Sequence, residues 1–183
     1  MKKLAIALSA ALAIGASFSA SAQSGTITFN GQITSVTCTI TWPGSGGTTT
    51  DPIVTLPTVP TSALAANGAT AGKQTVSLVI GGSDSLCTSG NAAIELDPNR
   101  TANQTNGYLN NTVEAVDGGA TNVQIALRDA SDAPINISTP WRSAEIDLSA
   151  TKQIDFAAEY RSTTAAAGAG KVAASVGYTI DYK

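Results

Sequence analysis

The chain has 183 residues and is mildly acidic, with ten basic and thirteen acidic residues, no histidine and 5% aromatic residues. Without a run of basic residues, nucleic acid and anionic membrane surfaces are poor candidates for partners. Without histidine, Ser–His and Cys–His catalysis is excluded, and the composition argues against an enzyme and implies no cofactor or metal.

The first 22 residues have the pattern of a secretory signal peptide. A Met-Lys-Lys start precedes an apolar or small run over residues 4–14, and residues 20–22, Ala-Ser-Ala, fit a cleavage site. The run is too short for a spanning helix, and membrane insertion is not expected. Cleavage before Gln23 removes two lysines, so eight basic residues face thirteen acidic ones and the net charge becomes −5.

The front of the mature chain, GTITFNGQITSVTCTI over residues 25–40, alternates in polarity but changes phase. The apolar residues lie first on odd and then on even positions: Ile27, Phe29 and Ile33, followed by Val36, Cys38 and Ile40. Side chains of a strand point to opposite faces in turn, so this slip sends the later set to the other face. Either a bulge re-aims one strand, or the first half belongs to a different core.

The two cysteines, Cys38 and Cys87, favour a disulfide, because an even count in an exported chain argues against two separate buried thiols. Closing a loop of about 50 residues stabilises a fold by roughly 4 kcal/mol in the chain-entropy model. Two distant cysteines without histidine are a poor metal site.

Short strand-like runs separated by turn residues make up most of the remaining chain. A Gly/Thr-rich loop precedes a short apolar run, and one helical turn fits residues 62–70. Strands are expected over residues 74–80, 92–96, 123–127 and 154–158, with a hairpin whose turn contains Asp129 and Asp132 before Pro134. This turn explains the two aspartates better than a shared cation does. The pattern predicts an all-β sandwich.

The last strand has the most regular alternation in the sequence. Its apolar face consists of six consecutive even positions: Val172, Ala174, Val176, Tyr178, Ile180 and Tyr182. A half-buried sandwich strand accounts for this face. A long apolar edge must nevertheless be covered, because an unpaired edge strand invites aggregation.

Four blocks of the sequence together resemble the chaperone–usher pilins of type 1 and type 3 fimbriae. They are GTITFNGQITSVTC, TVSLVIGGSDSLC, ATNVQIALRDASDAPI, and IDFAAEY with GKVAASVGYTIDYK. Such pilins carry a penultimate tyrosine, matched by Tyr182, and a glycine fourteenth from the C-terminus, matched by Gly170.

The resemblance implies an immunoglobulin-like sandwich that lacks its last strand, formed here by residues 32–183. A neighbouring subunit completes it with its N-terminal extension, residues 23–31. The implied donor residues are Gln23, Gly25, Ile27, Phe29 and Gly31. The implied acceptor groove contains Gly170 and the six residues of the apolar face named above.

The implied function is a structural subunit of a surface fimbria that supports adhesion, more in keeping with a major rod subunit than with a minor or adaptor one. The implied partners are other pilin subunits, a periplasmic chaperone and an outer-membrane usher, with export through the periplasm to the cell surface. The rival interpretation is a secreted carbohydrate-binding sandwich that stacks sugars on Trp42 and Trp141.

Overall fold

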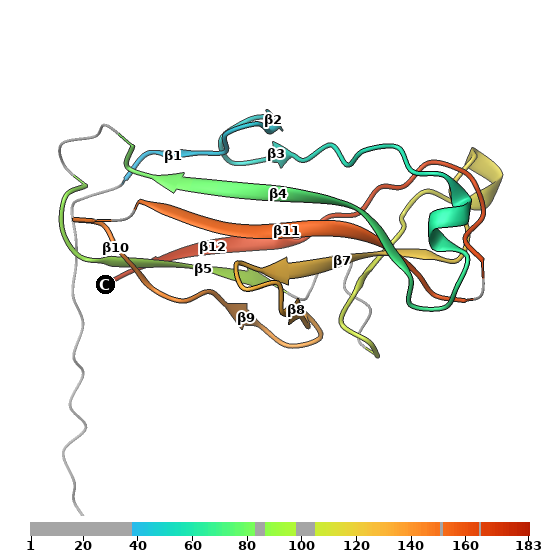
Figure 1. Ribbon diagram of the computed structural model, residues 1–183. Helices are drawn as coiled ribbons and strands as arrows, with labels where there is room; N and C mark the ends of the chain where they lie inside the picture. Colours follow the sequence, from blue (N-terminus) through green and yellow to red (C-terminus); the bar gives the residue numbers. More distant parts are fainter. Residues whose placement is uncertain (1–37, 83–86, 98–104, 151, 165) are drawn as a thin grey trace, which may run out of the picture. The chain divides into compact units, whose positions relative to one another are not determined.

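The computed structural model describes residues 38–82, 87–97, 105–150, 152–164 and 166–183, all within one unit of the chain, Thr34–Lys183. These residues form two packed β-sheets and two short 3-10 helices (Figure 1). The expected signal peptide, the donor extension and the phase change near Ser35 lie outside the described residues.

The first sheet is antiparallel throughout and carries the longest strands. Its order is β1 (Ile40–Thr41), β4 (Thr70–Ile80), β11 (Gln153–Ser162), β7 (Val123–Asp129) and β6 (Leu109–Asn110), and β8 (Pro134–Ile135) also pairs with β7. Val, Ile and Leu at alternate positions give these strands one apolar face each.

The second sheet is smaller and is built around β5 (Asn91–Asp97). The order is β10 (Ile146–Asp147), β5 and β12 (Gly177–Tyr182), and β9 (Trp141–Arg142) pairs with β5. A two-stranded ribbon joins β2 (Gly46–Gly47) to β3 (Pro52–Ile53), and the 3-10 helices are η1 (Thr61–Leu64) and η2 (Ala115–Asp117).

The core lies between the two sheets, because the alternating apolar residues of both pack into one cluster. Its fully buried members include Leu78, Ile80, Ile94 and Leu96. A smaller cluster of Leu64, Val123 and Ala167 lies under η1. The expected all-β sandwich is confirmed.

Most of the expected elements are confirmed, and the differences are local. The strands expected over residues 74–80, 92–96, 123–127 and 154–158 are β4, β5, β7 and β11. The helical turn is η1, and the hairpin joins β7 to β8. The Gly/Thr-rich loop contains the β2–β3 ribbon, and the last strand is paired only from Gly177 onward.

The expected disulfide joins Cys38 to Cys87, whose Cα atoms are 5.6 Å apart. Gly81 lies against it in a left-handed conformation (φ 78°), and a Cβ at that position would come within 2.5 Å of the Cys87 Cβ. The Gly81 amide also donates to the Thr39 carbonyl at 2.6 Å. Only glycine fits this contact, which holds the end of β4 beside the bridge.

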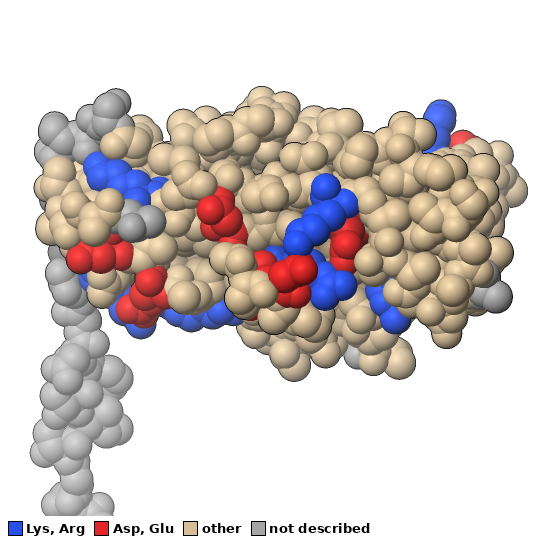
Figure 2. Space-filling view, in the orientation of Figure 1, with Lys and Arg blue, Asp and Glu red and all other residues tan. Residues whose placement is uncertain are grey.

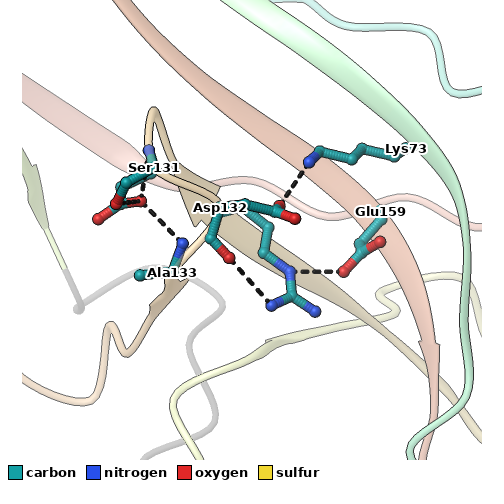
Figure 3. Close-up of polar contacts among 7 residues, drawn as sticks. Lys73, Ser131, Asp132, Ala133 and Glu159 are labelled. Atoms are coloured by element: carbon teal, nitrogen blue, oxygen red, sulfur yellow. Dashed lines mark hydrogen bonds and ion pairs between the residues drawn. The ribbon is translucent and has the colours of Figure 1, made fainter.

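Charged residues gather over the middle of the outward face of the first sheet, where β7, β8 and β11 lie (Figure 2). Arg128 Nε is 2.7 Å from Glu159 Oε1, and Lys73 pairs with Asp132 (Figure 3). Asp129 Oδ1 accepts the backbone amides of Ser131 and Ala133. Asp129 thus shapes the hairpin turn and Asp132 forms an ion pair, as a polar turn requires.

Gly170 lies where two distant segments come closest. A Cβ at this position would be 2.4 Å from the Ala120 amide nitrogen and 2.5 Å from the Gly119 carbonyl carbon. Gly119 forms an isolated parallel β-bridge with Lys171. The glycine thus lets the residues that lead into β12 approach the backbone of residues 119–120.

Gly170→Ala should lower the free energy of unfolding by about 1–3 kcal/mol, because the added methyl group overlaps backbone atoms that have no room to move. Gly46→Ala is the matched control: its Cβ would meet no atom closer than 3.9 Å, so the change should stay within about 0.5 kcal/mol. Chemical denaturation of both variants measures the difference. Equal midpoints would contradict the close packing at Gly170.

Candidate functional site

The candidate site is the C-terminal edge, defined here as residues 171–182, which comprise β12 and the extended residues before it. All six of its even-numbered residues pack against the core, yet each stays half-buried. In the adjacent β5, by contrast, Ala92, Ile94 and Leu96 are at most 1% exposed. The inward face of the C-terminal edge therefore remains partly open.

Strand β12 is paired along one edge only. Its six residues pair with β5, from Gly177 opposite Asp97 to Tyr182 opposite Ala92. Along the other edge no strand of the described chain lies. Because a strand exposes backbone N–H and C=O groups on both edges, this side of β12 can accept another strand.

The residues before β12 are held by a loop instead of a strand. The side chain of Asn111 makes four hydrogen bonds here: its Nδ2 donates to the carbonyls of Ala120 (2.9 Å) and Lys171 (3.1 Å), and its Oδ1 accepts from the amides of Val113 (3.1 Å) and Ala173 (3.0 Å). One half-buried amide side chain thus fixes the beginning of the C-terminal edge to the η2 loop.

Tyr178 fastens the middle of the C-terminal edge to the loop between Trp42 and β3. Its ring is 5.2 Å from that of Trp42, which lies 6.4 Å from Phe156 of β11. The Tyr178 hydroxyl donates to the carbonyls of Thr49 (3.3 Å) and Thr50 (3.1 Å). Burial raises the pKa of this hydroxyl. The aromatic groups thus join both sheets at this point.

A second extended segment, residues 54–59, follows the β2–β3 ribbon. Burial alternates over its first part, where Val54 and Leu56 are half-buried and Thr55 and Pro57 are exposed, and the alternation ends at Thr58. Val54 and Leu56 pack against the same core cluster as the C-terminal edge. No strand of the described chain pairs with residues 54–59.

The residues expected from sequence divide between described and undescribed parts of the chain. The acceptor residues from Val172 to Tyr182 lie together on the C-terminal edge, with Gly170 just before it. The donor residues from Gln23 to Gly31 lie outside the described residues. Sequence reasoning missed the hydrogen bonds of Tyr178 and Asn111, which connect segments about 130 and 60 residues apart and leave no local signal.

The packing of the two tryptophans does not favour a sugar-stacking pair. Trp42 makes its ring contacts with Phe156 and Tyr178, and Trp141 packs against the core opposite Leu96. A polar hollow of about 480 Å³ lies elsewhere, beside β6 and β7. Its amides bond one another, as from Gln124 Nε2 to Asn110 Oδ1 at 2.8 Å, so its polarity is accounted for within the fold.

The described residues also contain no group of three acidic, histidine or cysteine side chains that could hold a metal ion. Among these same residues, none forms a helix with the length and apolar character needed to cross a membrane.

Comparison with known proteins identifies the family. The family model described as fimbrial protein matches residues 27–183. The chain belongs to the fimbrial protein family. It is 37% identical to the major fimbrial subunit SMF-1 of Stenotrophomonas maltophilia (strain K279a), with 91% of this chain and 97% of that protein covered. It is 31% identical to the F17 fimbrial protein of Escherichia coli, with 94% of each covered.

The fold of this fimbrial protein has a counterpart among solved structures. The P pilus rod subunit PapA superposes with a TM-score of 0.53 over 87% of this chain and 100% of that one, at 14% identity. This likeness concerns the fold, an immunoglobulin-like sandwich. Family and fold together identify a structural pilus subunit, and the carbohydrate-binding alternative is not favoured.

The carboxylates of this fimbrial protein should make the free energy of unfolding decrease in acid, while it should not change with pH near neutrality. Hydrogen bonds from Ser131, Lys73 and Ser149 lower the pKa values of Asp129, Asp132 and Asp147. A lowered folded-state pKa contributes stability above the unfolded value, about 4, which is lost as the pH falls through the folded value.

With no histidine to titrate, the melting temperature should be constant between about pH 5.5 and 8 and should fall below about pH 4. Calorimetry across this range tests the expectation. A transition in stability near pH 6.5 would contradict it.

Proposed function

We propose that the chain is a fimbrial subunit that polymerises by strand addition, with residues 23–31 of one copy completing the sandwich of the next. The observation that carries the proposal is the C-terminal edge, whose inward face is apolar but half-buried and along whose outer edge no strand of the described residues lies. A strand added beside β12 would bury that face and pair its free backbone groups.

The extended segment of residues 54–59 supports the same proposal from the other side. Its residues 54–57 alternate in burial as a strand does, Val54 and Leu56 pack on the same core as the C-terminal edge, and among the described residues no strand pairs with it. An inserted strand would therefore find a second extended wall opposite β12. In this proposal the added strand lies between the two segments.

The side-chain sizes of the two partners favour one antiparallel register. Gly25 opposite Tyr178 leaves room for the large Tyr178–Trp42 pair. Ile27 then lies opposite Val176, and Phe29 lies opposite Ala174, the smallest residue on this face. Directly opposite side chains in antiparallel strands are about 4.5–5.5 Å apart, so the small Ala174 leaves room for the Phe29 ring across from it. A shift of two residues would put Ile27 against Tyr178.

This contact is directional, because the donor segment and the acceptor edge are different surfaces of the chain. Such a heterologous contact does not close on itself and generates a fibre. Burying Ile27 and Phe29 contributes about 1.5–3 kcal/mol each. Before assembly the open edge needs protection, which is the task of the periplasmic chaperone and outer-membrane usher that we infer as partners on the way to the cell surface.

We further infer that the chain is a major rod subunit, because it is 37% identical in sequence to a major fimbrial subunit over nearly its whole length. In this role the exported chain forms the body of a surface fimbrium, and it supports cell adhesion as part of that filament. No minor or adaptor role is needed to account for the open edge.

A peptide with the sequence QSGTITFNG, which spells residues 23–31, should raise the melting temperature of a chain that lacks residues 23–30. The rise should increase with peptide concentration, as for any ligand selective for the folded state. Phe29→Asp in the peptide should abolish the effect, because an unpaired carboxylate would enter the core. A stable, monomeric truncated chain that ignores the peptide would refute strand addition.

The register is tested by exchanging volume across the interface. Ala174→Phe in the chain should weaken peptide binding at least tenfold by overfilling the site opposite Phe29, and Phe29→Ala in the peptide should restore it. Ala173→Phe is the matched control, since Ala173 is exposed on the outward face. Titration calorimetry gives the affinities. Restoration by Ile27→Ala instead would place the register two residues away.

A further inference from the structure

An ionic network on the outward face of the second sheet reaches the end of the C-terminal edge. Arg142 Nη1 is 2.6 Å from Asp181 Oδ2, and Arg142 Nη2 is 3.0 Å from Glu145 Oε1. The Lys183 ammonium pairs with the same Glu145 oxygen. Four side chains from two separate parts of the chain thus form one connected group, which we name the Arg142 network.

The Arg142 network crosses the central strand of the sheet. Arg142 of β9 lies opposite Glu95 of β5, while Asp181 of β12 lies opposite Ala93 on the other side of β5. The guanidinium must therefore extend over β5 to reach Asp181. Ala93 points outward at the crossing and is nevertheless 0% exposed, as expected for a methyl group covered by a long side chain.

The network lies at the end of β12, beyond the hydrogen bonds made by Asn111 and Tyr178. Asn111 fixes the beginning of the C-terminal edge and Tyr178 fixes its middle. Beyond Tyr178, the described contacts that hold the strand are its ladder with β5, the two backbone hydrogen bonds between Lys183 and Asn91 (2.8 Å each), the packing of Ile180 and Tyr182, and this network. An edge strand paired on one side only frays from its end unless side chains restrain it.

We propose that Arg142 is a positioning residue for strand addition. It holds the last residues of β12 in register with β5, so that the outer edge of β12 can receive a donor strand. This inference rests on the proposed function. Arg142 does not touch the donor, because it lies on the outward face; it acts through Asp181.

Arginine suits this role better than lysine would. Its planar guanidinium binds two carboxylates with different nitrogens at fixed geometry, as it does with Asp181 and Glu145. A lysine ammonium has three rotatable donors without this planar geometry, so it would hold the two carboxylates less rigidly. Isolated exposed ion pairs contribute little to stability, whereas a connected network can order the elements it joins.

The test compares Arg142→Met with Arg128→Met in the chain that lacks residues 23–30, with the peptide QSGTITFNG as the probe. Arg128 pairs with Glu159, whose side chain is only 7% exposed, on the other sheet and away from β12. Arg128→Met should therefore lower the melting temperature at least as much as Arg142→Met. Only Arg142→Met should weaken the peptide, by about fivefold, because the apparent affinity falls with the fraction of binding-competent acceptor.

Two further measurements separate positioning from general stability. The peptide has no charged side chain, so with blocked ends any dependence of its affinity on salt reports ion pairs within the subunit. That dependence should vanish in Arg142→Met and persist in Arg128→Met. Amides of residues 179–183 should exchange hydrogen faster in Arg142→Met than in the unsubstituted chain, and Arg142→Lys should be intermediate in both measurements.

Three results would overturn the inference. Unchanged peptide affinity and amide exchange in Arg142→Met would show that β12 does not need the network, and strand addition would still stand. Equal weakening by Arg128→Met would assign the effect to overall stability. Failure of the unsubstituted chain to bind the peptide would refute the proposed function, and the positioning role with it.

Discussion

An apolar strand edge with only one neighbour is the constraint on which this structure depends. The C-terminal edge contributes six alternating side chains to the core, yet none of them is fully buried. Each unpaired backbone group and each exposed methyl group on this edge favours association with another extended chain. If the chain polymerises by strand addition as proposed, the same property would favour self-association of the isolated subunit and strengthen the joint between subunits.

The fold restrains that edge at three points without filling it. Asn111 holds its beginning, Tyr178 its middle, and the Arg142 network its end. All three restraints leave the outer edge of β12 free, because they come from the inward face, from the η2 loop or from the outward face of the sheet. An acceptor that is held in register before binding loses less conformational entropy when a partner strand arrives.

Sequence periodicity predicted the long strands because their alternation is local. In β4, β5, β7 and β11 the larger apolar side chains recur at alternate positions, although residues 123–127 of β7 are buried without interruption. The Cys38–Cys87 bridge is expected from the even cysteine count and the predicted signal peptide. The two-residue strands β9 and β10 are too short to show any period. Their pairing with β5 depends on the register of segments about 45–55 residues apart, and the Arg142 network also joins Arg142 to Asp181, 39 residues away.

The glycines also differ in whether their role comes from local sequence or from a contact between distant segments. Asn-Gly and Gly-Gly pairs mark turns in any sequence, but the requirement at Gly170 comes from the backbone of residues 119–120, some 50 positions away. Family resemblance pointed to Gly170, and the close approach supplies the reason. It lets the C-terminal edge begin against the η2 loop.

The disulfide has a mechanical meaning in a chain that polymerises by strand addition. It joins Cys38, just before β1, to Cys87, just before β5. The bridge thereby links the first strand, in chain order, of each sheet. In a filament built this way, tension enters each subunit through its N-terminal segment close to this bridge. The covalent link would pass the load to both sheets at once, so that neither β1 nor β5 has to resist it through hydrogen bonds alone.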